Sequence, residues 1–209
     1  MDDLAANGLV VGFDLDMTLI DGRPGIGAAW RVLSAETGVP IDVDLVVSRL
    51  GPPLEDELAV WFPAGDIERL AKRYRGDIYP VEAIAGTTPM PGAHDALAAV
   101  RRLGGRTLVV TAKSQANAEL HMRDLGLDVD LVVGGLWSDG KATALREHGA
   151  SVYVGDHTGD IRGARAADAV AVAVATGPIP FADLRAAGAD AVLHDLTEFP
   201  AWLTSHVAS

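Results

Sequence analysis

The sequence contains no cysteine. Disulfide bonds and cysteine metal ligands are therefore excluded, and the absence fits a reducing compartment such as the cytoplasm. The sequence also has no apolar run long enough to span a bilayer. Its first residues, MDDLAANG, are acidic rather than hydrophobic, so we expect no signal peptide there. These features predict a cytoplasmic protein without a membrane partner.

Positive charge is also scarce. The 17 Lys and Arg residues face 29 Asp and Glu residues, which gives a formal net charge of −12. Proteins that bind nucleic acid present basic patches to the phosphate backbone, so this balance argues against a nucleic-acid partner. The 209 residues, 49% of them hydrophobic, are enough for one substantial domain or for a domain with an insertion.

Short β-branched runs predict a parallel sheet. They are nearly continuous rather than alternating, which is typical of strands buried on both faces, and they begin at Leu9, Arg106, Asp130, Ser151, Ala169 and Asp190. Helical patterns over residues 92–104, 114–126 and 139–149 separate several of them, and each ends in a Gly suited to a helix C-terminus. This alternation predicts an α/β fold with a doubly wound parallel sheet. Ligands of such sheets bind at the carboxyl ends of the strands.

A long segment after the first strand breaks the alternation. From about Pro24 to Gly86 there is no convincing strand, and the helical patterns over 25–38, 43–51, 53–62 and 65–79 are separated by prolines. We therefore expect a helical insert over residues 23–86, with residues 1–22 and 87–209 forming the α/β core.

The insert also predicts some local structure of its own. Its apolar residues are expected to form a small separate core that includes Trp30, Leu58, Val60 and Trp61. Its acidic cluster, residues 55–57, follows Pro53 and is expected to supply charge at the start of a helix.

Two acids follow the first predicted strand, in the stretch VVGFDLDMTLIDG. In extended backbone, Asp14 and Asp16 project to the same side, at the strand end where a ligand would bind. Two carboxylates at close range are costly unless a cation neutralises them or one stays protonated. Taken alone, the stretch fits a solvated turn with helix-capping acids equally well, because short motifs often match by accident.

The ends of other strands add complementary groups. Thr111 ends the second strand and is followed by Ala112 and Lys113, so a hydroxyl, an ammonium group and the free N–H groups of the next helix are available to an anion. Lys141 opens a later helix. Asp156 and Asp160 follow the fourth strand, four positions apart. One edge of the sheet would gather all of these side chains.

This ordered set resembles the haloacid dehalogenase superfamily of phosphohydrolases. FDLDMTLID is similar to its first motif, Asp-x-Asp-x-Thr, and VVTAKS to its second. Lys141 in SDGKATAL stands where the third motif has Lys, and VGDHTGDI is similar to the fourth motif. PMPGAHDALAAVRRLGGRTLVVTAK and the stretch at 187–190 resemble the phosphoglycolate-phosphatase-like subgroup, and the insert falls where that subgroup carries a helical C1-type cap. The resemblance implies a Rossmann-like core with an inserted α-helical cap.

The resemblance also implies a reaction, the hydrolysis of a small phosphate monoester, phosphoglycolate-like or related, through an aspartyl-phosphate intermediate. Asp14 would be the nucleophile. Asp16 would protonate the leaving oxygen and then deprotonate the attacking water. Thr111 and Lys141 would hold the phosphoryl oxygens. The partner implied is a small phosphorylated metabolite, and the protein could be a monomer or a homodimer.

Counting charges explains why a metal is expected. Asp14, Asp16, Asp156 and Asp160 carry four negative charges and the substrate phosphate up to two more, which one Lys cannot offset. A hard divalent cation can, and Mg²⁺ is the expected choice. Asp14 and Asp156 are expected as direct carboxylate ligands. The resemblance implies a backbone carbonyl ligand from Asp16. Asp160 could bind the metal directly or contact the residues that bind it.

Three residues are candidates for substrate contact. Arg49 lies in SRLGPPLEDEL, which has the form of a tight loop between two insert helices, and the subgroup places such a loop over the leaving group. Arg49 could hold a substrate carboxylate or hydroxyl there, or it could be a solvated surface residue. Lys113 could compete with Lys141 for the phosphate. Ala112 stands where the subgroup commonly has Asn, and Lys141 is not followed by the subgroup's Pro-x-Pro. These departures leave the catalytic positions filled and bear on the substrate.

Other functions share parts of this pattern. A phosphomutase of the β-phosphoglucomutase type uses the same residues and differs in what attacks the aspartyl phosphate. A phospho-aspartate receiver module lacks both the helical insert and a second Asp at the position of Asp16. A haloacid dehalogenase proper needs neither that acid nor a metal cluster.

His157 adjoins Asp156 but is expected to be a loop side chain, because Asp16 already fills the acid–base role. His94 and His121 are expected to be structural or solvated.

Overall fold

A computed structural model describes residues 8–208. The expectation about a signal peptide concerns the first residues of the chain, and it lies outside this described part. None of the helices within residues 8–208 is both long enough and apolar enough to cross a membrane.

The six apolar runs form one parallel sheet, as predicted. Its strands, in the order β5-β4-β1-β6-β7-β8, are Leu131–Val133 (β5), Arg106–Val110 (β4), Val10–Phe13 (β1), Val152–Gly155 (β6), Val170–Val174 (β7) and Ala191–Leu193 (β8). Every neighbouring pair is parallel. The chain builds β4 and β5 on one side of β1 and then returns to build β6, β7 and β8 on the other. The carboxyl ends of β1, β4 and β6 therefore meet at the point where the strand order reverses, which is where such sheets bind ligands.

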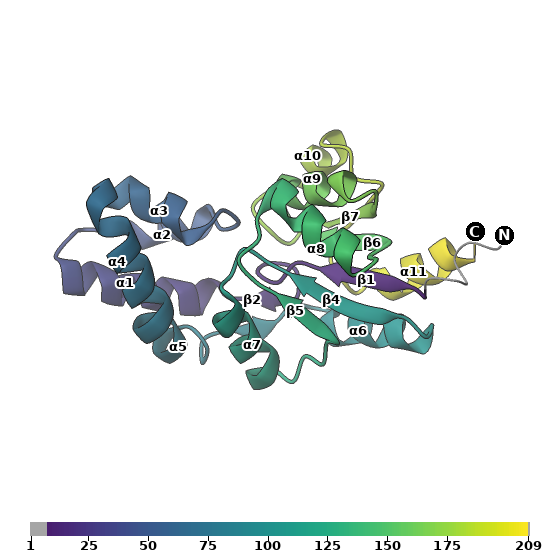
Figure 1. Ribbon diagram of the computed structural model, residues 1–209, viewed down its shortest axis with the longest axis horizontal. Helices are drawn as coiled ribbons and strands as arrows, with labels where there is room; N and C mark the ends of the chain where they lie inside the picture. Colours follow the sequence, from purple (N-terminus) through teal and green to yellow (C-terminus); the bar gives the residue numbers. More distant parts are fainter. Residues whose placement is uncertain (1–7, 209) are drawn as a thin grey trace.

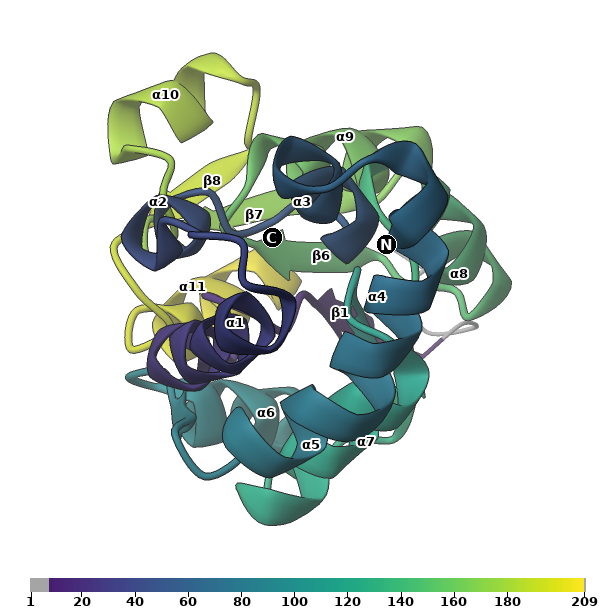
Figure 2. The ribbon, with the colours of Figure 1, turned by 90° about the vertical axis from the view of Figure 1, so that its left-hand side faces the viewer.

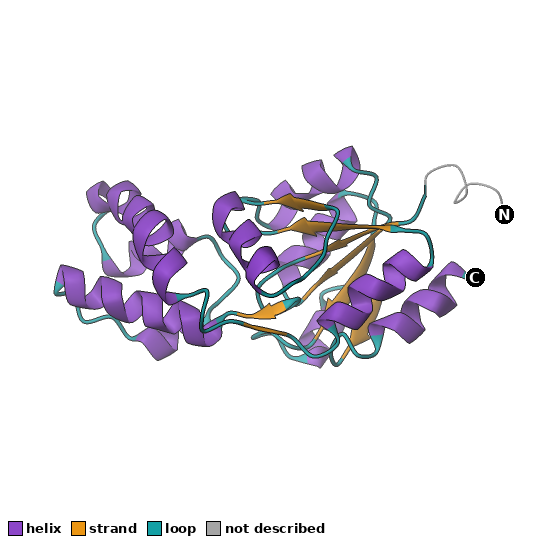
Figure 3. Cartoon of the chain, turned by 90° about the horizontal axis from the view of Figure 1, so that it is seen from below, coloured by secondary structure: helices purple, strands orange, loops and turns teal. Residues whose placement is uncertain are grey.

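Helices cover both faces of the sheet (Figures 1 and 3). One face packs against α6 (Ala93–Arg102), α7 (Gln115–Asp124) and α11 (Phe199–Val207). The other packs against α8 (Lys141–Glu147), α9 (Thr158–Ala166) and α10 (Phe181–Ala186). The glycines expected to end the three predicted helices have φ angles of 73°, 59° and 70°, at Gly104, Gly126 and Gly149. The left-handed region favours Gly, so these residues stop the helices.

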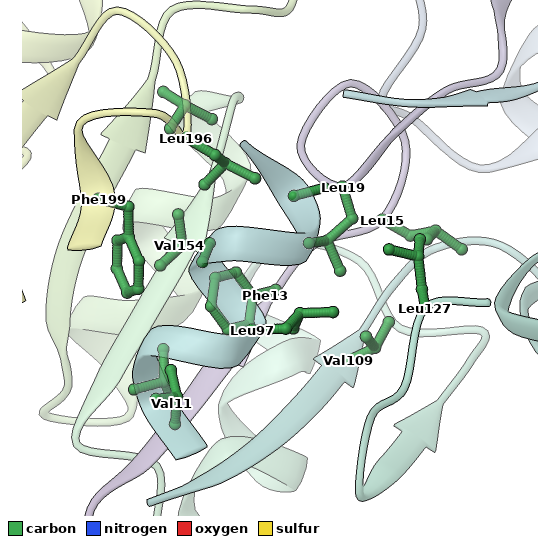
Figure 4. Close-up of a cluster of buried hydrophobic side chains, with 14 of the residues drawn as sticks. Val11, Phe13, Leu15, Leu19, Leu97, Val109, Leu127, Val154, Leu196 and Phe199 are labelled. Carbon is green, nitrogen blue, oxygen red and sulfur yellow. The ribbon is translucent and has the colours of Figure 1, made fainter. Parts of the chain in front are cut away.

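Alternate residues of β1 supply the two halves of the core. Val11 and Phe13 belong to the cluster under α6 and α11, whereas Val10 belongs to the cluster on the opposite face. Figure 4 shows Phe13 between Leu97 of α6 and Phe199 of α11. The Phe13 and Phe199 rings meet edge to face at 5.4 Å between centroids. This packing fixes β1, and with it the position at which the two aspartates leave the sheet.

The predicted insert is helical throughout. It runs through α1 (Arg23–Thr37), α2 (Val43–Ser48), α3 (Leu54–Trp61), α4 (Ile67–Arg73), a π-helical turn (Tyr74–Ile78) and α5 (Tyr79–Glu82). Two short antiparallel strands that the sequence did not predict, β2 (Ile20–Asp21) and β3 (Thr88–Pro89), lead into it and out of it. The insert lies on the side of the sheet opposite to α11 (Figure 1), and in Figure 2 its helices stand in front of the strands.

The insert has a hydrophobic cluster of its own, separate from the two sheet clusters. Trp30 and Leu58 are buried in it, and Trp61 packs against it. The prediction for Val60 was wrong, because its side chain is 56% exposed on the outer surface of α3.

Candidate active site

The ends of β1 and β4 open into one pocket beneath the insert. The backbone N–H of Asp14 donates to Val154 O (2.8 Å), and that of Thr111 donates to Val133 O (3.0 Å), so both residues are tied to neighbouring strands. Asp14, Asp16, Thr111, Ala112 and Lys113 line the core side of the pocket. The insert contributes the opposite wall, which includes Arg49.

Three of the predicted acids form a buried cluster. Asp14, Asp156 and Asp160 each offer a carboxylate oxygen, and these atoms all lie within 4.8 Å of one another. Burial, followed by the nearby charge of Asp160, raises the pKa of Asp14 to about 6, although Lys141 opposes the shift. Burial and the same repulsion raise the pKa of Asp156 well above its usual range. The candidate ligands in this cluster are all carboxylates, and their charges repel one another. Such a set of oxygen ligands fits a hard divalent cation such as Mg²⁺.

Contacts that the sequence analysis did not predict hold Asp156 in the cluster. Its Oδ1 accepts a hydrogen bond from the Thr18 hydroxyl at 3.0 Å. A Cβ added at Gly177 would lie 1.8 Å from Asp156 Oδ2, so only Gly leaves room for the carboxylate. Thr18 is part of the quoted first motif, which was a usable signal. Gly177 follows β7, and no sequence motif marked it as part of the site.

Lys141 is the cation of the cluster. It is fully buried, with Nζ 2.9 Å from Asp14 Oδ1, 2.6 Å from Asp160 Oδ1 and 2.9 Å from the Tyr153 hydroxyl. Burial alone would lower the pKa of Lys141, but the charges of Asp14 and Asp160 outweigh it and raise that pKa well above its usual value. Lys141 therefore stays protonated beside the carboxylate that is expected to attack phosphorus.

Asp160 is fully engaged by the protein. Its Oδ1 accepts from Lys141, and its Oδ2 accepts the backbone N–H of His157 at 3.0 Å. These bonds suit a residue that orients Lys141 and the loop before α9. His157 lies in that loop, as expected, where its Nδ1 accepts the N–H of Gly159 (3.0 Å) and its ring packs on Trp137.

Asp16 is set apart from the acidic cluster. The chain turns sharply after it, because Met17 has a φ of 60°, a conformation uncommon for residues other than Gly. Asp16 Oδ2 lies 3.1 Å from Lys113 Nζ, and Asp16 Oδ1 is buried without a hydrogen-bond partner among the described residues. One carboxylate is thus held near the cluster but outside it, as a separate acid or base requires.

Lys113 also links the core to the insert. Its ammonium group donates to the hydroxyl of Tyr79, which begins α5, and that hydroxyl lies 2.8 Å from His121 Nε2 of α7. Because ammonium can only donate, the Tyr79 hydroxyl accepts from Lys113, and the same hydroxyl shares a second hydrogen bond with His121. Burial, with the nearby charge of Lys113, lowers the pKa of His121 to about 4, so its ring is neutral. The three residues are far apart in the sequence, and no motif signalled the contact.

The two arginines of the insert that line the pocket are paired with acids. Arg49 Nη2 donates to Glu57 Oε1 at 2.5 Å, and the same oxygen accepts the Trp61 indole N–H at 2.9 Å. Arg75 donates to both oxygens of Glu55, with Nη2 2.7 Å from Oε2. Both acids lie in the first turn of α3, as predicted. The sequence did not reveal that they also neutralise arginines on the pocket wall.

Comparison with known proteins agrees with this geometry. The sequence model of the haloacid dehalogenase-like hydrolase family matches residues 11–165, which is more than half of the chain. The tyrosine-protein kinase PtkA of Mycobacterium tuberculosis is 30% identical over 83% of this chain, and the match spans 65% of PtkA's own length. A phosphoglycolate phosphatase of Chromobacterium violaceum is 30% identical over 90% of this chain and 93% of that enzyme.

A solved structure shares the whole architecture. A haloacid dehalogenase-like hydrolase from Streptococcus pneumoniae superposes with a TM-score of 0.82 at 25% identity, covering 95% of this chain and 99% of the other. The family match spans Asp14, Thr111, Lys141 and Asp156. Asp14 and Thr111 line the pocket, and Lys141 and Asp156 lie beside Asp14 in the buried cluster. The chain belongs to the haloacid dehalogenase-like hydrolase family.

Proposed function

We propose that this hydrolase is a Mg²⁺-dependent phosphatase of small phosphate monoesters, phosphoglycolate-like or related, and that it acts through an aspartyl phosphate. One observation carries the proposal. The buried Asp14 carboxylate shares a site with Lys141 and two further acids, while Asp16 stands apart, paired with Lys113. A nucleophile beside a cation and a separate acid–base group are what a two-step phosphoryl transfer requires.

The residues divide the reaction between them. An Asp14 oxygen attacks phosphorus, the ester P–O bond breaks, and Asp16 gives its proton to the departing oxygen. Asp16 then takes a proton from a water molecule that attacks the phosphorus and releases Asp14. Thr111 and Lys141 hold the phosphoryl oxygens and stabilise their charge. Mg²⁺ bound by Asp14 and Asp156, with Asp160 beside them and a backbone carbonyl of Asp16, would offset the negative charge of the site.

The insert, residues 23–86, serves in this proposal as a cap that covers the pocket and keeps bulk water out. Its wall faces the catalytic side chains in the same pocket. The substrate is accordingly a phosphorylated metabolite small enough to lie between cap and core.

A phosphatase and a phosphomutase differ in the acceptor of the phosphoryl group, which is water in a phosphatase. A phosphomutase would pass the group from Asp14 to a second hydroxyl of a sugar phosphate, and the mycobacterial relatives are named as tyrosine kinases. Transfer to water releases inorganic phosphate in step with the alcohol. Measuring both products from one substrate therefore distinguishes hydrolysis from transfer.

The test of the proposed function is an assay with a generic aryl phosphate. Activity should vanish when EDTA removes divalent cations and return when Mg²⁺ is added. Ca²⁺ should support the reaction poorly, because it accepts a looser and higher coordination. Full activity in metal-free buffer would refute the metal-dependent mechanism.

A further inference from the structure

We infer that the leaving group of the substrate is uncharged, with an apolar body and one neutral hydrogen-bonding group such as a hydroxyl. The inference rests on the proposed function, since it concerns the alcohol part of a phosphate monoester. Within the small phosphate monoesters of that proposal, it narrows the substrate to related esters whose leaving group carries no carboxylate, and so excludes phosphoglycolate itself.

The first observation is the composition of the cap wall. The side chains that the insert turns toward the pocket are mostly apolar and come from α1, α2, α3 and the loop between α2 and α3: Ile26, Trp30, Val46, Leu50 and Leu54. A charged group placed against such a wall loses its hydration without gaining a partner. An alkyl or aromatic group gains from the same contact, because it leaves water.

The second observation is the pairing of the cap's arginines. Arg49 and Arg75 both line the pocket, but Arg49 is bonded to Glu57 and Arg75 to Glu55. A substrate carboxylate would have to approach these acids as well as the arginines. On the core side, Lys113 is paired with Asp16. Beyond the phosphate site, each of these three cations on the pocket wall is thus already paired with a carboxylate of the protein, so a substrate carboxylate would have to compete for it.

The third observation is a pair of buried hydrogen-bonding atoms left unused. Tyr74 is 4% exposed and lines the pocket, and its hydroxyl has no partner within residues 8–208. Arg49 Nε is also buried without a partner in that range. Burial raises the pKa of Tyr74, so the hydroxyl is neutral. A buried polar atom that no protein group satisfies is a natural contact for a ligand, and a neutral hydroxyl or carbonyl would satisfy either atom.

Three matched esters test this inference: butyl phosphate, 4-hydroxybutyl phosphate and 3-carboxypropyl phosphate. All three release a primary alcohol, so differences in kcat/KM report binding of the distal group. The wild type should hydrolyse 4-hydroxybutyl phosphate best and 3-carboxypropyl phosphate worst, with a gap of roughly tenfold or more between those two. A wild type that prefers 3-carboxypropyl phosphate would overturn the inference.

Variants locate the cause of that order. Glu57→Gln keeps an acceptor oxygen for Arg49 and Trp61 but removes the negative charge, so it should raise kcat/KM for 3-carboxypropyl phosphate relative to butyl phosphate several-fold. Glu68→Gln, at an exposed position on α4, removes the same charge away from the pocket and should leave that ratio unchanged. Tyr74→Phe should bring the ratio of 4-hydroxybutyl to butyl phosphate toward one. An unchanged ratio in Glu57→Gln would contradict the inference.

The aryl phosphate assay separates the two levels of failure. If the wild type hydrolyses the aryl phosphate with Mg²⁺ but ranks the three alkyl esters in the opposite order, or cleaves none of them, the inference fails and the proposed function stands. If no ester is hydrolysed with Mg²⁺, both fail.

Discussion

Asp156 shows how closely single residues are fitted around the acidic cluster. The Thr18 hydroxyl bonds one of its oxygens, and the absence of a side chain at Gly177 makes room for the other. Burial and the neighbouring acids destabilise the charged form of Asp156. The hydrogen bond from Thr18 and the space at Gly177 oppose this effect and keep the carboxylate in the cluster.

A substitution at Gly177 tests this fit. Gly177→Ala should push the Asp156 carboxylate out of position, lower kcat by roughly tenfold or more and raise the Mg²⁺ concentration needed for half-maximal activity. Gly65→Ala is the control, because a Cβ at that exposed position meets no atom within 4 Å. A Mg²⁺ titration of both variants decides the matter. Equal behaviour of the two variants would show that Asp156 tolerates displacement or binds no metal.

The sequence predicted much of the site at this scale, and the reasons are physical. Apolar runs mark where the strands end, and parallel strands bring their carboxyl ends to one edge, so Asp14, Thr111 and Asp156 could be placed together before the fold was known. The contact of Lys113 with Tyr79 and His121 could not be predicted. It depends on how the insert sits on the core, which no local pattern encodes.

Among the elements, the loop between α2 and α3 is the part of the insert that contacts the core beside Asp156. It was expected to be tight, and Gly51 within it has a φ of 137°. A Cβ there would lie 3.2 Å from the His157 ring and 3.3 Å from the Trp137 ring. The loop thus rests on the segment that carries Asp156 and Asp160.

Crowding this contact should weaken closure of the pocket. Gly51→Ala is expected to lower kcat/KM by several-fold to about tenfold, because the loop must move away from Trp137 and His157. Gly38→Ala is a matched control. Its φ is also positive, at 70°, but a Cβ there meets no atom within 4 Å, so it carries backbone strain without the contact. Steady-state kinetics should therefore separate the two variants, and a similar loss in both would assign the effect to strain alone.

Longer elements were predicted more reliably than shorter ones. The six strands of the main sheet and the helices α6, α7 and α8 follow from apolar runs and terminal glycines. The strands β2 and β3 span two residues each, too few for a period to be visible. Val60 was misassigned because α3 is covered on one face alone, and a helix of eight residues gives a weak periodic signal.

At the scale of the whole molecule, the insert and the core are joined by a buried contact that depends on pH. Tyr79 of the insert bonds His121 of the core. Burial lowers the pKa of His121 from 6.5 to about 4 in the folded protein. Between pH 4 and pH 6.5, His121 is therefore largely protonated in the unfolded chain and largely neutral in the folded protein. This residue's contribution to stability is therefore complete above pH 6.5 and is lost as the pH falls toward 4.

The predicted slope can be measured. His121 should reduce the free energy of unfolding by up to ~1.4 kcal/mol per pH unit across this window. Asp14 acts in the opposite direction there, since its folded pKa is raised to about 6, so the comparison must be between proteins that differ at His121. His121→Phe should be less stable near neutral pH, where it loses the bond to Tyr79, and its stability should fall less on acidification. Denaturant unfolding at several pH values gives both curves, and parallel curves would contradict the assignment.

The central claim is that Asp14 carries the phosphoryl group and Asp16 moves the protons. Mass spectrometry of rapidly quenched enzyme tests it directly, with an aryl phosphate whose good leaving group needs little protonation. Asp16→Asn should accept the phosphoryl group and then stall, so that phosphate is found on the peptide containing Asp14. Asp14→Asn should trap nothing and lose on the order of 10³ or more in turnover. Phosphate trapped in Asp14→Asn but not in Asp16→Asn would mean that the roles of the two aspartates are exchanged, and would contradict the account.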